Sequence, residues 1–217
     1  MAGDLRTLGM FPLSLVLFPT AGLPLQVFEP RYLALMADCL DGDGEFGVVL
    51  ISRGSEVGGG DQRVAVGTSA RISHLGSIDD GRLMVLASGV ERLRVVSWLP
   101  DDPYPRAEVE PFALELGPHD RKSVTRAERA VRHLSYAVCE LGEVPALPYG
   151  VDLSGSPEEV AWRLCSLAPL NLIDHQELLA ASSVQEQMEC LRLLCEARTQ
   201  DVVAMLSDGL SDGSETL

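Results

Sequence analysis

The chain has 217 residues, enough for one large domain or two small ones with a substantial hydrophobic core. Hydrophobic residues make up 46% and charged residues 23% of it, the composition of an ordinary globular protein. The formal net charge is -15 at pH 7, and the acidic excess is spread over both halves of the chain. Because nucleic acids are held chiefly by Lys and Arg, this charge argues against a nucleic-acid partner.

No apolar run approaches the ~20 residues that a membrane-spanning helix needs, so we expect no membrane association. The apolar segment 8–18 is similar to a signal-peptide core, but Pro12 interrupts it and no clear cleavage site follows. The cysteines form no Cys-x-x-Cys pair, and most lie in apolar helical patterns, which predicts buried free thiols in a reducing compartment. They are Cys39, Cys139, Cys165, Cys190 and Cys195. We therefore expect a cytoplasmic protein.

The segment 10–32 is apolar but interrupted by proline. Pro12, Pro19 and Pro24 exclude a single helix or a single central strand, so short extended pieces joined by fixed bends are expected. Pro30 is well placed to begin a helix. Apolar residues then recur at helical spacing up to the Asp-Gly-Asp-Gly sequence that ends the run; they are Leu33, Met36, Ala37 and Leu40.

The remainder of the N-terminal half is typical of β-strands. Residues 64–70 and 83–87 each place apolar side chains on one face of an extended segment, and Asp-Asp-Gly at 79–81 predicts a hairpin turn between them. An antiparallel sheet that curls to hide its edges, plugged by one helix, satisfies this pattern. We predict a β-rich subdomain with one helix over residues 1–117.

The hydrophobic period becomes helical after residue 117. Apolar side chains are spaced by three or four residues along 124–141, which places them on one stripe of a helix. They are Val124, Ala127, Val131, Leu134, Val138 and Leu141.

Three later positions carry helix-capping residues. Ser156, Asp174 and Ser183 are placed to cap further helices, the last of which should end at Leu206. We predict an α-helical subdomain over residues 118–206 and, because apolar residues are few beyond it, a disordered acidic tail over 207–217. The fold class is therefore α+β.

Several segments occur in an order and spacing that together are more specific than any one of them. They are the proline-interrupted opening at 10–32, Phe-Gly-Val-Val-Leu at 46–50, and the strand-like segments at 66–72, 81–95 and 103–110. This arrangement resembles the substrate-binding N-terminal domain of Lon proteases, a module that also occurs as a free-standing protein. The resemblance covers about residues 8–206. Gln26 departs from it, since the family often has a histidine there.

The resemblance implies a PUA-like pseudobarrel followed by an α-helical bundle. It also implies a non-enzymatic module that binds polypeptides, engaging apolar or unfolded segments or regulating proteolysis. The expected partners are polypeptide clients, or a protease or regulatory protein. The sequence identifies neither the client nor the oligomeric state.

The sequence lacks the motifs of a Lon-type peptidase and of the common metal sites. A Lon-type peptidase needs a Walker A loop and a Ser-Lys pair, yet Lys122 follows no glycine-rich loop, and its neighbour Ser123 would point away from it on a helix. The histidines are far apart and none lies in a metal-binding frame; they are His74, His119, His133 and His175. We therefore expect no catalytic residue, no metal and no cofactor.

Two groups of residues are candidates for binding. The apolar residues of the opening are candidate polypeptide contacts, although aromatic residues of this kind are more often part of a core. They are Leu15, Leu17, Leu23, Leu25, Phe28 and Tyr32. A basic concentration opposite the apolar stripe is a candidate partner-docking face, against the alternative of a solvated face with pairs such as Glu128 to Arg132. It comprises Arg121, Lys122, Arg126, Arg129 and Arg132.

Two other classes of function stay open at this stage. A PUA-like nucleic-acid-binding protein would show a basic groove on the β-rich half. A hydrolase with an unrecognised site would show a concave pocket holding two or more ionisable groups with perturbed pKa values.

Overall fold

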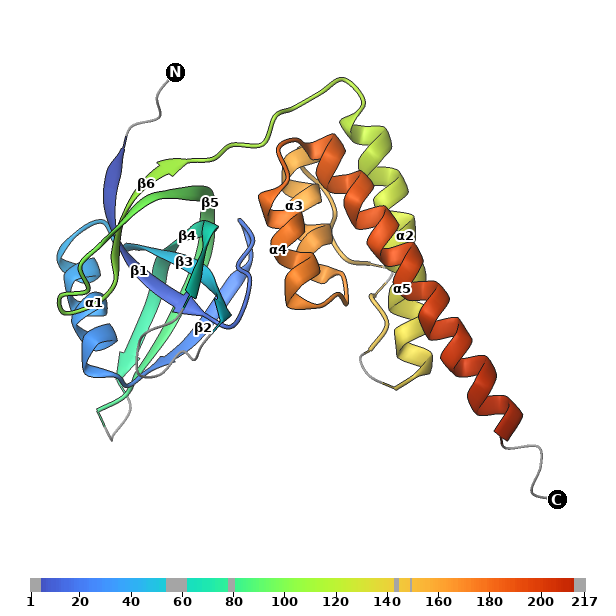
Figure 1. Ribbon diagram of the computed structural model, residues 1–217, viewed down its shortest axis with the longest axis horizontal. Helices are drawn as coiled ribbons and strands as arrows, with labels where there is room; N and C mark the ends of the chain where they lie inside the picture. Colours follow the sequence, from blue (N-terminus) through green and yellow to red (C-terminus); the bar gives the residue numbers. More distant parts are fainter. Residues whose placement is uncertain (1–4, 54–61, 78–80, 143–144, 149, 213–217) are drawn as a thin grey trace. The chain divides into compact units, whose positions relative to one another are not determined.

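A computed structural model describes residues 5–53, 62–77, 81–142, 145–148 and 150–212, which form six strands and five helices. The chain divides into two units, Met1–Ala113 and Leu114–Leu217, which hold the strands and most of the helices respectively (Figure 1). The sequence placed the predicted boundary after residue 117, whereas these two units meet between Ala113 and Leu114. The α+β fold class is confirmed. Among the described residues, no helix is long and apolar enough to span a membrane.

The first unit contains all six strands and one helix. In chain order these are β1 (Arg6–Leu13), β2 (Gly22–Val27), α1 (Pro30–Asp41), β3 (Glu45–Arg53), β4 (Gln62–Ser77), β5 (Leu83–Leu99) and β6 (Arg106–Pro111). The predicted turn at 79–81 lies partly outside the described residues, as does the glycine-rich segment between β3 and β4.

The strand order is β2-β5-β4-β3-β1-β6, and an additional pairing of β5 with β6 closes five of these strands into a barrel. The long strand β5 serves two neighbours in turn, pairing with β2 through residues 83–88 and with β6 through residues 93–99. The sheet is mixed where an antiparallel one was expected, because β1 and β3 pair in parallel. Such a pair needs a crossover connection, and β2 and α1 provide it.

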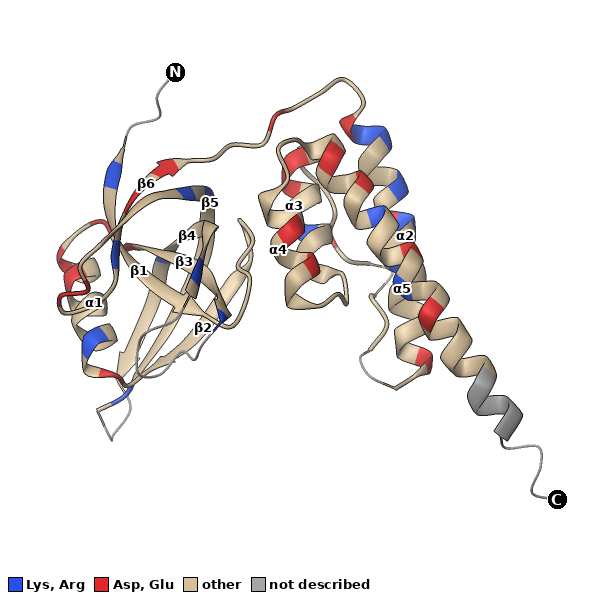
Figure 2. Ribbon diagram, in the orientation of Figure 1, with Lys and Arg blue, Asp and Glu red and all other residues tan. Residues whose placement is uncertain are grey.

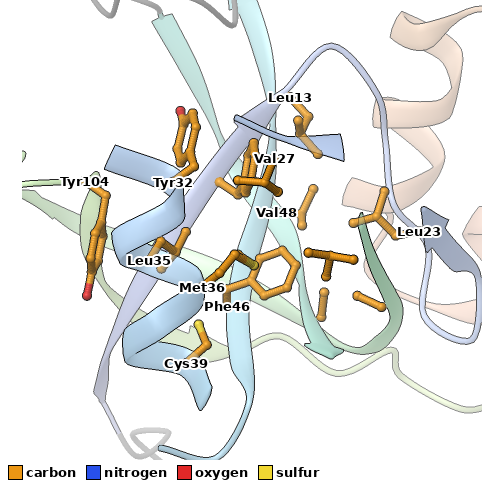
Figure 3. Packing of buried hydrophobic residues seen from close by; sticks show 14 of the residues in the cluster. Leu13, Leu23, Val27, Tyr32, Leu35, Met36, Cys39, Phe46, Val48 and Tyr104 are labelled. Carbon is orange, nitrogen blue, oxygen red and sulfur yellow. The ribbon is translucent and has the colours of Figure 1, made fainter. Parts of the chain in front are cut away.

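Helix α1 packs its inner face on the main core of the first unit. Pro30 begins the helix as predicted. Its buried residues are Tyr32, Leu35, Met36 and Cys39, whereas Leu40 and Ala37 of the predicted stripe are exposed. Figure 3 shows this inner face pointing toward Phe46 of β3.

The second unit is helical. It comprises α2 (Asp120–Glu140), α3 (Pro157–Leu167), α4 (Leu172–Ala180) and α5 (Val184–Asp212). The predicted stripe of α2 is buried from Val124 to Val138 and packs mainly on α5. Helix α5 is longer than the sequence suggested, since it continues past Leu206 to Asp212; the rest of the predicted disordered tail lies outside the described residues.

Capping rules located the start of α3 correctly and that of α4 three residues too late. Ser156 accepts a hydrogen bond from the Glu159 backbone while the Glu159 carboxylate accepts from the Ser156 N–H, a complete capping box on α3. Helix α4 is capped by Asn171 instead of the expected Asp174, because the Asn171 side-chain oxygen Oδ1 accepts from the N–H groups of Ile173 and Asp174.

Candidate functional site

A cavity of about 230 Å3 opens in the first unit where β1, β2 and the start of α1 meet. It is lined by Phe11, Leu13, Leu15, Pro24, Leu25, Gln26, Val27, Phe28, Glu29 and Tyr32. Four of the six predicted polypeptide contacts, Leu15, Leu25, Phe28 and Tyr32, therefore lie around one hollow.

The wall formed by α1 is held in place by aromatic and ionic contacts. The Tyr32 ring stacks on Phe11 with the ring centroids 4.0 Å apart, and the Arg31 guanidinium lies 4.5 Å from the centroid of Tyr32. Arg31 Nε also donates to a Glu29 carboxylate oxygen at 3.0 Å, so the two charges that flank Pro30 neutralise each other. These contacts hold the α1 wall of the hollow in place.

Phe28 is the largest exposed apolar side chain of the lining. It is 55% exposed, whereas Leu15 and Leu25 are half-buried. Its place directly after β2 and before Pro30 explains this, since Val27 and Tyr32 on either side both turn into the core. A large exposed aromatic ring beside an apolar hollow is typical of a binding surface.

Strand β2 presents a free edge to this hollow. Among the described strands it pairs with β5 alone. The Gly89 N–H donates to the Ala21 carbonyl, and hydrogen-bonded pairs alternate along an antiparallel ladder, so Leu23 and Leu25 direct their backbone groups to β5. Pro24 and Gln26 therefore direct theirs away from it. Pro24 has no N–H to lose there, which is why proline is tolerated at such an edge.

Two predicted contacts are excluded from the hollow. Leu17 is 4% exposed and Leu23 3%, and both belong to the core instead of the cavity lining. Tyr32 is equally buried and contributes only part of the cavity wall. Six lining residues were not among the candidates from the sequence: Phe11, Leu13, Pro24, Gln26, Val27 and Glu29. Val27 could have been predicted, because alternate residues of a strand share a face and Val27 therefore lies on the same face of β2 as Leu23 and Leu25.

The cavity offers little for chemistry. Glu29 is its one acidic or basic lining residue among those described, and its charge is compensated by Arg31. No group of three or more His, Cys, Asp or Glu residues in the described part of the chain could hold a metal ion. These residues provide neither an acid–base pair nor a nucleophile beside the hollow.

Two thiols of the helical unit, those of Cys190 and Cys195, are poor nucleophiles. Burial, followed by the nearby Glu177 carboxylate, raises the pKa of Cys190 to about 12. Burial likewise raises the pKa of Cys195 to about 12. A reactive cysteine needs a lowered pKa, so these groups are protonated and inert near neutral pH.

The cations of the β-rich unit are largely engaged with carboxylates. Glu45 accepts from Arg6 at 2.9 Å and from Arg71 at 2.6 Å, and Arg63 pairs with Asp101 at 3.0 Å. Such pairing leaves little positive potential for a phosphate backbone, which weakens the nucleic-acid alternative.

The predicted docking face of α2 is divided by the structure. Arg121, Lys122, Arg126 and Arg129 are exposed. Arg132 is separate from them, because its Nε donates to the Glu128 carboxylate at 2.9 Å and the residue lines neither cavity beside this face.

Comparison with known proteins relates the chain to Lon proteases. Lon protease 2 of Herpetosiphon aurantiacus is 28% identical over 183 residues, which are 82% of this chain and 22% of that protein. The Lon protease of Koribacter versatilis is 28% identical over 198 residues, 87% of this chain and 24% of that protein. The chain thus spans less than a quarter of the length of these relatives.

Solved structures give the same relationship at the level of the fold. The Lon N-terminal domain protein from Xanthomonas campestris matches with a TM-score of 0.60 and 29% identity, covering 86% of this chain and 96% of that one. The N-terminal domain of the Mycobacterium avium complex Lon protease matches with a TM-score of 0.65 and 14% identity, covering 88% and 98%. The sequence model of the ATP-dependent protease La (LON) substrate-binding domain matches residues 7–196, and the chain belongs to that family.

Proposed function

We propose that this chain is a non-enzymatic recognition module that binds an extended, apolar segment of a polypeptide along the free edge of β2. One apolar side chain of the ligand enters the hollow beside Phe28, and the ligand backbone pairs with the outward groups of Gln26 and Pro24. The observation that carries the proposal is the coincidence of an unpaired strand edge with an apolar cavity. Membership of a substrate-binding family supports the polypeptide as the class of ligand.

The energetics of this mode favour weak and broadly specific binding. Burying one apolar side chain contributes about 1.5–3 kcal/mol, and each backbone hydrogen bond contributes about 0.5–1.5 kcal/mol net. Association costs ~4–15 kcal/mol in lost freedom, so a few such contacts barely exceed the cost. A module of this kind samples many unfolded chains and releases them readily, which suits the delivery of clients to a protease or regulatory protein. The free thiols of the described chain are compatible with action in the cytoplasm.

The experiment is fluorescence anisotropy with a labelled, permanently unfolded polypeptide and matched surface variants. Phe28→Ala should weaken binding by about fivefold or more, because it removes ~100 Å2 or more of apolar contact. Leu40→Ala is the control, since Leu40 is 56% exposed but lies on α1 away from the hollow. Gln26→Pro should also weaken binding, because it deletes an N–H that faces away from β5. Equal effects of Phe28→Ala and Leu40→Ala would contradict the proposed site.

A further inference from the structure

A second surface, distinct from the β2 hollow, lies on the helical unit and carries a concentration of positive charge. Figure 2 shows Lys and Arg gathered along the first part of α2. We refer to Arg121, Lys122, Arg126 and Arg129 as the α2 basic face. All four side chains are exposed, and none of them forms an ion pair with a described residue. Arg126 has a more distant carboxylate near it, since it contributes, after Arg192, to lowering the pKa of Glu189 on α5. On a chain of net charge -15, the concentration of four cations on one face still calls for a physical explanation.

The α2 basic face lines a groove and is not a flat surface. One cavity of about 580 Å3 lies between α2 and α5, and a second of about 500 Å3 adjoins it along α2. Arg126 and Arg129 line both cavities, so the two adjoin; all the described lining of the second cavity comes from α2, and the α5 wall belongs to the first. From Arg121 to His133, which lines the far end, α2 rises by about 18 Å at ~1.5 Å per residue. An extended peptide of about five or six residues, at ~3.3 Å each, spans that length.

The opposite wall of the groove is pre-organised, and its one guanidinium and two carboxylates leave it with a single net negative charge. Arg192 of α5 donates to Glu189 at 2.6 Å and to Glu196 at 2.5 Å, which fixes its guanidinium between the two carboxylates. Thr199 and Gln200 continue this wall with uncharged polar groups. The free positive charge of the groove therefore comes from α2, while α5 supplies shape and hydrogen-bonding groups.

The placement of these cations opposes the local rules of helix stability. Arg121 and Lys122 lie in the first turn of α2, where the helix dipole favours negative charge. Lys122 and Arg126 are four residues apart and Arg126 and Arg129 three, so like charges face each other along the helix. Local conflicts of this kind are expected at binding sites, where a ligand of opposite charge relieves them.

We propose that the groove along the α2 basic face binds a short acidic segment of a partner protein, rich in Asp and Glu. Length and charge both favour this occupant over a nucleic acid. Four cations match the carboxylates of about five or six residues, whereas a duplex lying along the same 18 Å carries about ten negative charges at one per ~1.7 Å. The acidic remainder of the chain repels a long polyanion beyond the groove.

The test is anisotropy of a short labelled peptide of alternating Glu and Gly, at physiological salt, with the full chain. The double variant Arg126→Gln/Arg129→Gln should weaken binding by about tenfold or more, since it removes two direct charge contacts. Arg132→Gln is the matched control: it lies on the same helix and loses the same charge, but pairs with Glu128 outside the groove. It should change affinity less than about twofold, and raising the salt concentration should weaken binding of the unmodified chain.

Each other result overturns the proposal. A Gln-for-Glu peptide that binds equally well, or an Arg132→Gln effect as large as that of the double variant, would show that the groove does not recognise carboxylates. An RNA hairpin that binds more tightly than the peptide would assign the face to nucleic acid. Self-association abolished by the double variant, without peptide binding, would assign it to a second copy. Phe28→Ala should leave peptide affinity unchanged, so failure of this proposal is separable from failure of the β2 site.

Discussion

At the scale of single residues, local contacts determine which side chains are available for binding at the β2 site and at the α2 basic face. At the β2 site, Phe28 remains outside the core because its neighbours Val27 and Tyr32 turn inward. At the α2 basic face, Arg132 is removed from the set of free cations by Glu128, four residues before it. In both cases the neighbouring residues decide which side chain is available: the backbone direction at Phe28 and an ion pair at Arg132.

His175 should make stability depend on pH. Burial lowers the pKa of His175, although its ring nitrogen lies 3.1 Å from the Ala168 carbonyl oxygen. The unfolded chain therefore binds a proton at a pH where the folded chain does not, so the free energy of unfolding should fall as the pH drops below ~6.5. Urea unfolding between neutral and mildly acidic pH measures this. His175→Gln should flatten the decline, whereas the same change at exposed His74 should leave it intact.

Gly89 should be needed for the close backbone packing next to the start of β2. A Cβ at this position would collide with the backbone of Phe18 and Pro19, while the Gly89 N–H donates to the Ala21 carbonyl at 2.9 Å. Gly89→Ala should destabilise the fold by about 1–3 kcal/mol and weaken polypeptide binding, because the backbone must shift where β2 begins. Gly76→Ala is the control, since a Cβ there meets nothing within 4 Å. Thermal unfolding of both variants decides the matter; equal stabilities would contradict the packing described.

At the scale of elements, the cations of α2 that should favour binding of an acidic peptide should also lower the stability of the helix. Lys122→Glu would place a negative charge in the first turn and pair it with Arg126 four residues on. It should therefore stabilise the chain by roughly 0.5–1.5 kcal/mol. The same change should weaken binding of the acidic peptide. Denaturant unfolding and anisotropy on one variant measure both effects, and a destabilised variant would refute the electrostatic account of α2.

Elements were predictable from the sequence where a local pattern determined them. The stripe from Val124 to Val138 and the Ser156 cap depend on neighbours in the chain, and both are found as expected. The buried face of α1 was misplaced because tertiary packing selected Tyr32 and Leu35 over Leu40. The β2 edge was beyond reach, since it depends on β5 dividing its length between β2 and β6, and no local spacing encodes a long-range pairing.

At the scale of the whole molecule, each of the two units carries a different candidate binding surface. The first unit carries the apolar hollow and its strand edge, and the second carries the α2 basic face. The proposed recognition of apolar polypeptide depends on the first unit, and the proposed recognition of an acidic segment on the second. A chain with both properties would hold a client and a partner by independent contacts.

If the proposed function is correct, the chain binds unfolded polypeptide in preference to nucleic acid. The most direct measurement is fluorescence anisotropy at physiological salt, in which the protein is titrated into a labelled unfolded polypeptide and, separately, into a structured RNA. We predict weak but saturable binding of the polypeptide and no saturable binding of the RNA. Saturable binding of the RNA alone, or of neither, would contradict the proposed function.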